Sequence, residues 1–291
     1  MIRLGYTTSE GRPDHIETDP TAKILDFREN DIKFLDLSLL NTCSNLEMLY
    51  LAKNQLETID LTPLAEISSL RWLDLSHNQL KQVSLSQLGE CKNLERLSLS
   101  YNPLGQVELS FLAQCPSLHT LRLTNTLLKN IDLNPLNKCS SLEQLSVSFN
   151  SLEEVDLAPL ASCSKLQTLT LNRNRLAHID LSPLSSCMQL KTLNLSDNRL
   201  DQVELDALST CFDLFSLNLS KNQLKEVDLT PIGKLQNLQG LDLSSNQLGT
   251  VDLTSLQHCT KTEIKLYGNP LEEILQPDNI CTNLVLEDLS K

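Results

Sequence analysis

Cysteines are the residues of this sequence most able to do chemistry, and eight of the nine recur at one position of a repeating pattern. A row of thiols offers zinc ligands or disulfides. Zinc needs four converging ligands, typically from short Cys-x-x-Cys pairs, and the sequence has no such pair. In stacked repeats the Cα–Cβ bonds of equivalent residues point in parallel directions, whereas a disulfide needs them to converge, so disulfides along the row are disfavoured. The eight positions are Cys43, Cys91, Cys115, Cys139, Cys163, Cys187, Cys211 and Cys259.

Hydrophobic residues take the cysteine position in two repeats, at Ile67 and Leu235. Neither residue can act as a metal ligand or a nucleophile, whereas both can fill a small buried apolar site. We therefore predict that the eight recurrent cysteines are reduced and buried in the core, and we expect no metal and no other cofactor. Cys281 lies outside this row and is expected to be the most reactive thiol.

A second row consists of carboxylates, one in most repeats. Such a row could hold cations or meet a basic partner. One carboxylate per repeat without a glycine-rich loop is a poor calcium site, so the favoured interpretation is structural: a solvated row near the positive end of a short helical turn. Its members are Asp36, Asp60, Glu108, Asp132, Asp156, Asp180, Glu204, Asp228 and Asp252, and Ser84 interrupts them.

Catalytic motifs are not found in the sequence. The five histidines fall at unrelated positions of the repeat, and His258 adjoins Cys259, which belongs to the predicted interior row. There is no G-x-S-x-G, no phosphate-binding glycine loop and no H-E-x-x-H. We expect a protein that is not an enzyme and has no small-molecule substrate.

The repeating unit is 24 residues long, as the leucines at Leu46, Leu70 and Leu94 show. In LEMLYLAKN, Leu49 and Leu51 alternate with outward residues, which is the period of a strand with one buried face. In the following TIDLTPLAEI, Thr62 is predicted as the N-cap and Pro63 as the first residue of one helical or 3₁₀ turn. Each unit thus predicts one strand and one short helical turn.

Asparagines follow the strands, and such an amide can bond the backbone of its own turn and of the next coil. In repeat five, Thr126 takes this position, so an irregular turn is expected there. The matching asparagines are Asn30, Asn54, Asn78, Asn102, Asn150, Asn174, Asn198, Asn222, Asn246 and Asn269.

With this pattern the chain resembles the leucine-rich repeat family over about residues 22–275, in about eleven copies. The resemblance implies an α/β fold: a right-handed, horseshoe-shaped solenoid with a concave parallel β-sheet and short helical or 3₁₀ turns on the convex side. It also implies that the asparagines form a ladder. Residues 1–21 are expected to form an N-terminal cap and residues 276–291 a C-terminal cap, because end repeats otherwise expose the core.

The overall composition of the chain disfavours some kinds of binding partner. The formal net charge is −13, which disfavours nucleic acid and anionic membranes. No apolar run is long enough to span a bilayer, and the beginning MIRLGYTTSE has no basic-then-apolar signal peptide. Together with nine cysteines, these features lead us to expect a cytoplasmic protein, acting as a monomer.

Outward positions on the concave face carry the functional prediction, because the repeat does not dictate them. In repeats two to five they are large, aromatic or charged, whereas later repeats place mainly threonine, asparagine and serine there. Trp, Tyr, Met and Arg are the residues enriched at interface hot spots. The predicted partner-binding residues are Met48, Tyr50, Trp72, Asp74, His77, Arg96, Tyr101, Arg122 and Phe149. The alternative is that these side chains merely cover the sheet near its N-terminal end.

The function predicted from the sequence is a non-catalytic intracellular scaffold or recognition module that binds a protein or peptide on its concave face. An inner wall of ten to eleven strands, roughly 4.8 Å apart, is suited to such a partner. One alternative is the sensor or targeting region of a larger signalling enzyme, such as a GTPase, kinase or ligase. Another is nucleic-acid sensing through Arg96, Arg122 and Arg173, which the charge balance disfavours.

Overall fold

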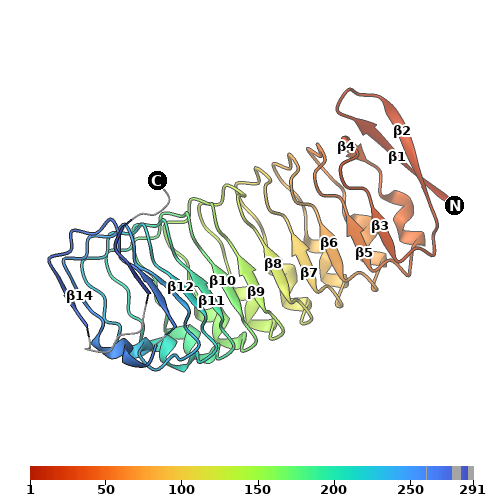
Figure 1. The fold of residues 1–291 in the computed structure, drawn as a ribbon. Coiled ribbons are helices and arrows are strands. Elements are labelled where there is room, and N and C mark those ends of the chain that lie inside the picture. The colour runs from red at the N-terminus through yellow and green to blue at the C-terminus, as the bar shows by residue number, and fades with distance from the viewer. Residues whose placement is uncertain (260, 277–282, 288–291) are drawn as a thin grey trace. The chain divides into compact units, whose positions relative to one another are not determined.

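The computed structural model describes residues 1–259, 261–276 and 283–287 (Figure 1). The chain divides into two units, Met1–Asn150 and Ser151–Lys291, and each is treated separately below. The accessible thiol expected at Cys281 lies outside the described residues.

The first unit begins with a three-stranded antiparallel sheet, in the strand order β2-β1-β4. Its strands are β1 (Ile2–Thr8), β2 (Pro13–Thr18) and β4 (Ile32–Leu35). Leu4 and Ile32 in this sheet are buried, so the sheet adds apolar cover at the end of the repeats where a cap is needed.

Parallel strands of three residues each follow one another, one per coil. In the first unit they are β3 (Ile24–Asp26), β5 (Met48–Tyr50), β6 (Trp72–Asp74), β7 (Arg96–Ser98), β8 (Thr120–Arg122) and β9 (Gln144–Ser146). In the second unit they are β10 (Thr168–Thr170), β11 (Thr192–Asn194), β12 (Ser216–Asn218), β13 (Gly240–Asp242), β15 (Glu263–Lys265) and β17 (Asn283–Val285). Residues one repeat apart lie opposite each other, as Met48 and Trp72 do. A separate parallel pair, β14 (Thr250–Asp252) and β16 (Glu273–Leu275), lies in the second unit.

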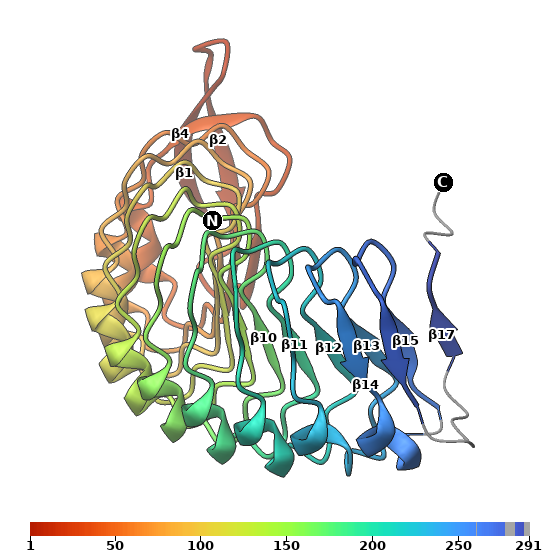
Figure 2. The same ribbon diagram turned by 90° about the vertical axis from the view of Figure 1, so that its left-hand side faces the viewer.

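The predicted helical turns are 3₁₀ helices, and within each unit they follow one another along one edge of the coils (Figure 2). In the first unit they are η1 (Ser38–Thr42), η2 (Thr62–Glu66), η3 (Ser86–Glu90), η4 (Ser110–Gln114) and η5 (Asn134–Lys138). In the second unit they are η6 (Ala158–Ser162), η7 (Ser182–Ser186), η8 (Asp206–Thr210), η9 (Thr230–Ile232) and η10 (Thr254–His258). One strand and one short helix per coil confirm the predicted solenoid.

The predicted N-cap is wrong in detail. Thr62 is the first residue of η2 and makes no side-chain cap bond; the residue before it is Leu61. The cap bond comes from the carboxylate row instead, because Asp60 Oδ1 accepts the Thr62 N–H at 2.9 Å. A short acidic side chain two residues before a free N–H closes this bond more readily than a hydroxyl on the same residue. The structural interpretation of the carboxylate row is therefore supported.

The same bond recurs along both units. Asp180 accepts the Ser182 N–H at 2.8 Å, and Asp252 accepts that of Thr254 at 2.8 Å. Hydrogen bonds from these backbone and hydroxyl groups lower the pKa of the Asp60, Asp180, Asp228 and Asp252 carboxyl groups.

Acid should destabilise the fold partly through these caps. Their pKa is lower in the folded than in the unfolded chain, so their stabilisation is present above about pH 4 and lost as the pH falls through the folded pKa. Replacing Asp60, Asp180, Asp228 and Asp252 together by asparagine keeps an acceptor but removes the titration. The urea midpoint should then fall less between neutral pH and about pH 3 than in the wild type. Replacing the exposed acids Glu66, Glu153, Asp213 and Glu226 by amides removes the same charge, and an equal flattening by this control would contradict the prediction.

The core is a stack of leucines with the cysteine row beside them. Cys91 and Cys115 are fully buried, and the described cysteines are free thiols. Several thiols also donate to the preceding coil: Cys91 Sγ lies 3.3 Å from the Leu64 carbonyl and Cys139 Sγ lies 3.4 Å from that of Leu112. The packing interpretation is confirmed, and the thiols also give a weak hydrogen bond that Ile67 cannot supply.

Thiol reactivity should be strongly suppressed in the folded protein. Burial raises the pKa of Cys91 and Cys187 to about 12 and that of Cys163 to about 11. Since the thiolate is the reactive form, labelling at about pH 8 should be at least about a hundredfold slower than in denaturant. The measurement is mass spectrometry of iodoacetamide-treated protein, peptide by peptide. Rapid modification of Cys91 in the native protein would contradict the assignment to the core.

The asparagine ladder is present as predicted. Asn78 Oδ1 accepts the Leu56 N–H of the preceding coil at 3.0 Å, and Asn78 Nδ2 donates to the carbonyls of Leu51 and Leu75, each at 3.0 Å. One amide thus joins two coils and its own turn. The same pattern recurs at Asn102, Asn198, Asn222 and Asn246.

Repeat five is irregular, as expected. Thr126 is fully buried, and its hydroxyl donates to the Leu123 carbonyl at 2.8 Å. With no amide to bond, the Leu104 N–H turns to the Asn102 carbonyl of its own coil at 2.9 Å. Pro103, which has no N–H, lies between these two residues and shapes this tight turn.

Candidate recognition surface

The sheet face of the first unit, meaning the outward side of strands β3 and β5–β9, presents two rows of side chains. The register places Ile24, Met48, Trp72 and Arg96 side by side in one row. The other row contains Asp26, Tyr50, Asp74, Ser98 and Arg122. Residues that are 24 apart in the sequence are therefore neighbours, as the sequence analysis predicted.

An aromatic stack forms the centre of this face. The rings of Tyr50 and Trp72 meet edge to face, with their centroids 5.0 Å apart and their planes at 74°. The Arg96 guanidinium lies over the Trp72 ring, 4.7 Å from its centroid. Trp72 faces outward as predicted, but these contacts leave it half-buried rather than fully exposed. Cation–π and edge-to-face contacts hold the ring in one orientation.

Arg28 extends the stack at its other end and was not identified from the sequence. Its guanidinium lies 4.8 Å from the centroid of the Tyr50 ring and pairs with Asp26 at 2.5 Å. Arg28 stands two residues before Asn30, a position that holds small residues in the next repeats, such as Ala52 and Ser76. This departure from the repeat is the signal that could have revealed it.

A second aromatic pair lies at the edge of the sheet face, where His77 and Tyr101 stack with centroids 4.2 Å apart and planes at 12°. Both residues have a left-handed backbone, with φ of 54° and 58°. The residue before each ladder asparagine adopts this conformation. For a residue other than glycine, the left-handed backbone costs on the order of 1 kcal/mol of conformational free energy. Identical backbone angles in consecutive coils aim the two rings the same way, so they stack.

The remaining predicted residues lie on the same face in different roles. The Tyr50 hydroxyl donates to the Met48 sulfur at 3.2 Å. Asp74 Oδ1 accepts the Ser76 hydroxyl at 2.6 Å, so this carboxylate also orders its own strand end. Phe149 is 39% exposed and follows Tyr101 in the edge row after one intervening coil. The structure thus brings Met48, Tyr50, Trp72 and Arg96 into one cluster and leaves Phe149 at its periphery.

Three shallow hollows divide the sheet face of the first unit. One of about 730 Å³ contains the carboxylates Asp26, Glu29 and Asp74. A second of about 420 Å³ contains Arg96, Arg122 and the carboxylates Glu95 and Glu143. The third, of about 320 Å³, contains Arg122 and no carboxylate.

The sheet face of the second unit is blander. Its outward positions hold Thr168, Thr170, Thr192, Asn194 and Ser216. Asn194 Oδ1 accepts the Ser196 N–H at 3.0 Å and hydroxyl at 2.8 Å, so this amide is used within its own strand end. This face carries no aromatic pair among the described residues.

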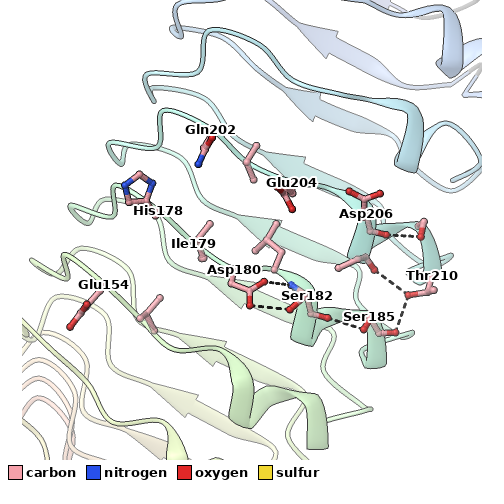
Figure 3. Close-up of a pocket in the computed structure, with 15 residues that line it drawn as sticks. Glu154, His178, Ile179, Asp180, Ser182, Ser185, Gln202, Glu204, Asp206 and Thr210 are labelled. Atoms are coloured by element: carbon pink, nitrogen blue, oxygen red, sulfur yellow. Dashed lines mark hydrogen bonds between the residues drawn. The ribbon is translucent and has the colours of Figure 1, made fainter.

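The second unit also has a groove of about 710 Å³ beside its 3₁₀ helices (Figure 3). Half-buried Val155, Ile179 and Val203 contribute apolar surface to it, and acidic residues such as Asp180 and Glu204 line it. Figure 3 shows the Asp180 carboxylate directed at Ser182, the bond that caps η7. The groove is an open surface whose acids are partly used as helix caps.

No group of three or more His, Cys, Asp or Glu side chains in the described ranges could hold a metal ion. Within the same ranges, no helix has the length and apolarity needed to cross a bilayer.

A coil of one short parallel strand, an asparagine turn and one 3₁₀ helix defines the class of leucine-rich-repeat solenoids. The leucine rich repeat family model matches residues 20–80, 164–224 and 214–271, and a second model for two-copy leucine rich repeats matches residues 68–114. The chain belongs to the leucine-rich repeat family. Members of this family serve mainly in recognition rather than catalysis. No curated protein matches the sequence.

Solved structures with a similar fold come from several different proteins. The functional domain of InlJ from Listeria monocytogenes, described as including a cysteine ladder, is 20% identical over 92% of this chain and 65% of that one, with a TM-score of 0.64. A receptor kinase ectodomain from Arabidopsis thaliana, GASSHO1/SCHENGEN3 in complex with Casparian strip integrity factor 2, is 25% identical over 90% of this chain and 39% of that one, with a TM-score of 0.58. TLR13 in complex with a single-stranded RNA is 25% identical over 88% of this chain and 36% of that one, with a TM-score of 0.66.

Proposed function

We propose that this chain is a non-catalytic recognition module that binds a peptide segment of a partner protein on the sheet face of the unit Met1–Asn150. The observation that carries the proposal is the stack of Tyr50, Trp72 and Arg96, with ring centroids 5.0 Å apart and the guanidinium 4.7 Å from the indole. Aromatic and arginine side chains held in one orientation lose little entropy when a partner covers them.

Exposed apolar surface adjoins the stack. Ile24 is 53% exposed and lies opposite Met48 in the sheet register. An apolar centre surrounded by charged side chains, here Asp26 and Glu47, is the arrangement of an interface hot spot. The receptor ectodomain bound to Casparian strip integrity factor 2 supports a partner of this kind.

The test is a selection of binding peptides from a random displayed library, followed by hydrogen-exchange mapping of the bound face. Peptides should protect amides of strands β5–β8 and leave the groove beside Asp180 and Glu204 unchanged. Protection confined to that groove would assign binding to the acidic surface and end the proposal.

For the whole protein, we propose a monomeric cytoplasmic scaffold, in keeping with the buried free thiols. The second candidate is the sensor or targeting region of a larger signalling enzyme, such as a GTPase, kinase or ligase. The observation behind it is that this chain spans only 39% and 36% of the two receptor chains it resembles. The length of the full gene product decides between the two, since a catalytic domain in the same chain would establish the second.

A further inference from the structure

The smallest hollow of the sheet face has a chemical character unlike its surroundings. It holds the Arg122 side chain, the rings of His77 and Tyr101, and otherwise only serine and threonine side chains. The chain has 37 acidic residues, and none lines this hollow. The two larger hollows beside it each contain at least two carboxylates.

Arg122 lines both this hollow and the adjoining one with Glu95 and Glu143, but among the described residues it has no carboxylate partner in an ion pair. Arg28 and Arg71 on the same face are paired, with Asp26 at 2.5 Å and with Glu95 at 2.9 Å from its Nε. Arg122 is exposed and its Nη2 bonds the neutral Gln144 amide oxygen at 3.3 Å. No carboxylate in the described part of the chain forms an ion pair with it. A guanidinium presents a planar set of donors that fits a carboxylate with two parallel bonds.

The hydroxyl groups can add to such a site. Ser100 Oγ accepts the Thr124 N–H at 3.1 Å, which leaves its hydroxyl hydrogen to donate elsewhere. The Tyr101 hydroxyl is held by the ring stack with His77. A guanidinium with hydroxyl donors around it is suited to one oxyanion.

The surroundings favour an isolated anion over a chain of them. Asp74 lies two strands from Arg122 in the same row of the register, and Glu143 lines the adjoining hollow. The net charge of −13 repels polyanions as a whole. A nucleic-acid backbone, with phosphates several ångströms apart, would place some of them near these carboxylates.

The distance between the hollow at Arg122 and the aromatic stack at Trp72 determines how one peptide could reach both. Adjacent strands are about 4.8 Å apart, and Arg122 on β8 also stands two residues farther along its strand than Trp72 on β6, so the two backbone positions are separated by roughly 12 Å. An extended peptide that crosses the strands covers this span in about three to four residues. We propose that the hollow at Arg122 takes one carboxylate of the partner, from an acidic residue about three to four positions from an apolar residue that covers Trp72. This inference rests on the proposed function.

The experiment uses the full chain as the target of a random displayed peptide library. Peptides selected on the wild type should be enriched in Asp or Glu about three to four positions from an aromatic or aliphatic residue. Selection on Arg122→Gln should lose the acidic preference and keep the apolar one. The matched control is Arg175→Gln, which removes the same charge from an exposed position and should leave both preferences unchanged.

A double-mutant cycle on one selected peptide locates the contact. Changing its acidic residue to the amide should weaken binding to the wild type about tenfold and binding to Arg122→Gln by less than about twofold. An equal loss on both proteins overturns the inference.

Other outcomes separate the two proposals. Peptides that depend on Trp72 but show no acidic preference overturn the carboxylate site and leave the recognition surface standing. Peptides whose binding is indifferent to Trp72 overturn the proposed function as well. An oligouridylate that binds through Arg122, with affinity falling steeply as salt rises, overturns the preference for an isolated anion.

Discussion

Replacing Trp72 by alanine is expected to weaken peptide binding at least about thirtyfold, which corresponds to about 2 kcal/mol. The change removes the ring that lies between Tyr50 and Arg96 and so removes the apolar centre of the sheet face. It also removes the ring that holds the Arg96 side chain in place, so binding would then include the entropic cost of ordering that side chain. Titration of a labelled selected peptide, at constant salt, measures the loss.

Stability has to be measured alongside, because Trp72 is half-buried rather than fully exposed. Loss of one aromatic pair and one cation–π contact should lower the free energy of unfolding by about 1–2 kcal/mol. The variant should therefore remain folded, with an unchanged circular dichroism spectrum. Trp72→Phe keeps a ring at this position and should recover most of the affinity.

Two controls bound this prediction. Thr192→Ala changes a residue on the sheet face of the second unit and should alter affinity less than about twofold. Replacement of Asp156, Asp180 and Glu204 by amides should be neutral as well. If affinity persists in Trp72→Ala and collapses in this triple variant, the acidic surface is the one that binds.

The fold could be predicted because the same residue types recur at the same structural positions in coil after coil. Buried leucines, ladder asparagines and core cysteines face the same surroundings in every coil, so one interpretation serves for all. Where one coil departs, as at Thr126, the sequence predicted an irregular turn, and the structure has one. The N-cap was missed because Thr62 and Asp60 are both good capping residues, and only backbone geometry decides which side chain reaches the free N–H.

The candidate site was predictable as a set of positions but not as a set of contacts. The period assigned Trp72 to the sheet face, whereas its burial depends on how far the Tyr50 and Arg96 side chains reach across the register. Arg28 was missed because the first repeat departs from the later ones at this position, where Ala52 and Ser76 follow. The hollow at Arg122 forms because neighbouring coils carry small residues, such as Ser98 and Ser100, whose side chains do not fill the space. It was not predicted because the sequence pattern shows which side chains are present and not the space between them.

Replacing Asn78 by alanine is expected to lower the free energy of unfolding by about 1–3 kcal/mol. The amide is buried, and its loss leaves the Leu56 N–H without its acceptor. The Leu51 and Leu75 carbonyls each lose one of two amide donors, because Leu51 still accepts from Asn54 Nδ2 at 3.0 Å and Leu75 from Asn102 Nδ2 at 2.9 Å. The orphaned Leu56 N–H therefore accounts for most of the cost. Urea unfolding followed by circular dichroism measures the cost as a lower midpoint.

Two further variants test the assignment of the asparagine ladder. Asn137→Ala changes an exposed asparagine on η5 and should alter stability by less than about 0.5 kcal/mol. Thr126→Asn restores the missing amide, but the Leu104 N–H already bonds Asn102 and the new side chain gives up the Thr126 hydroxyl bond to Leu123. Gain and loss are then of similar size, so the change should stay within about 1 kcal/mol of the wild type in either direction. If Asn78→Ala is as mild as Asn137→Ala, then the coils are held together by leucine packing alone, and the ladder only follows the turn that packing has made.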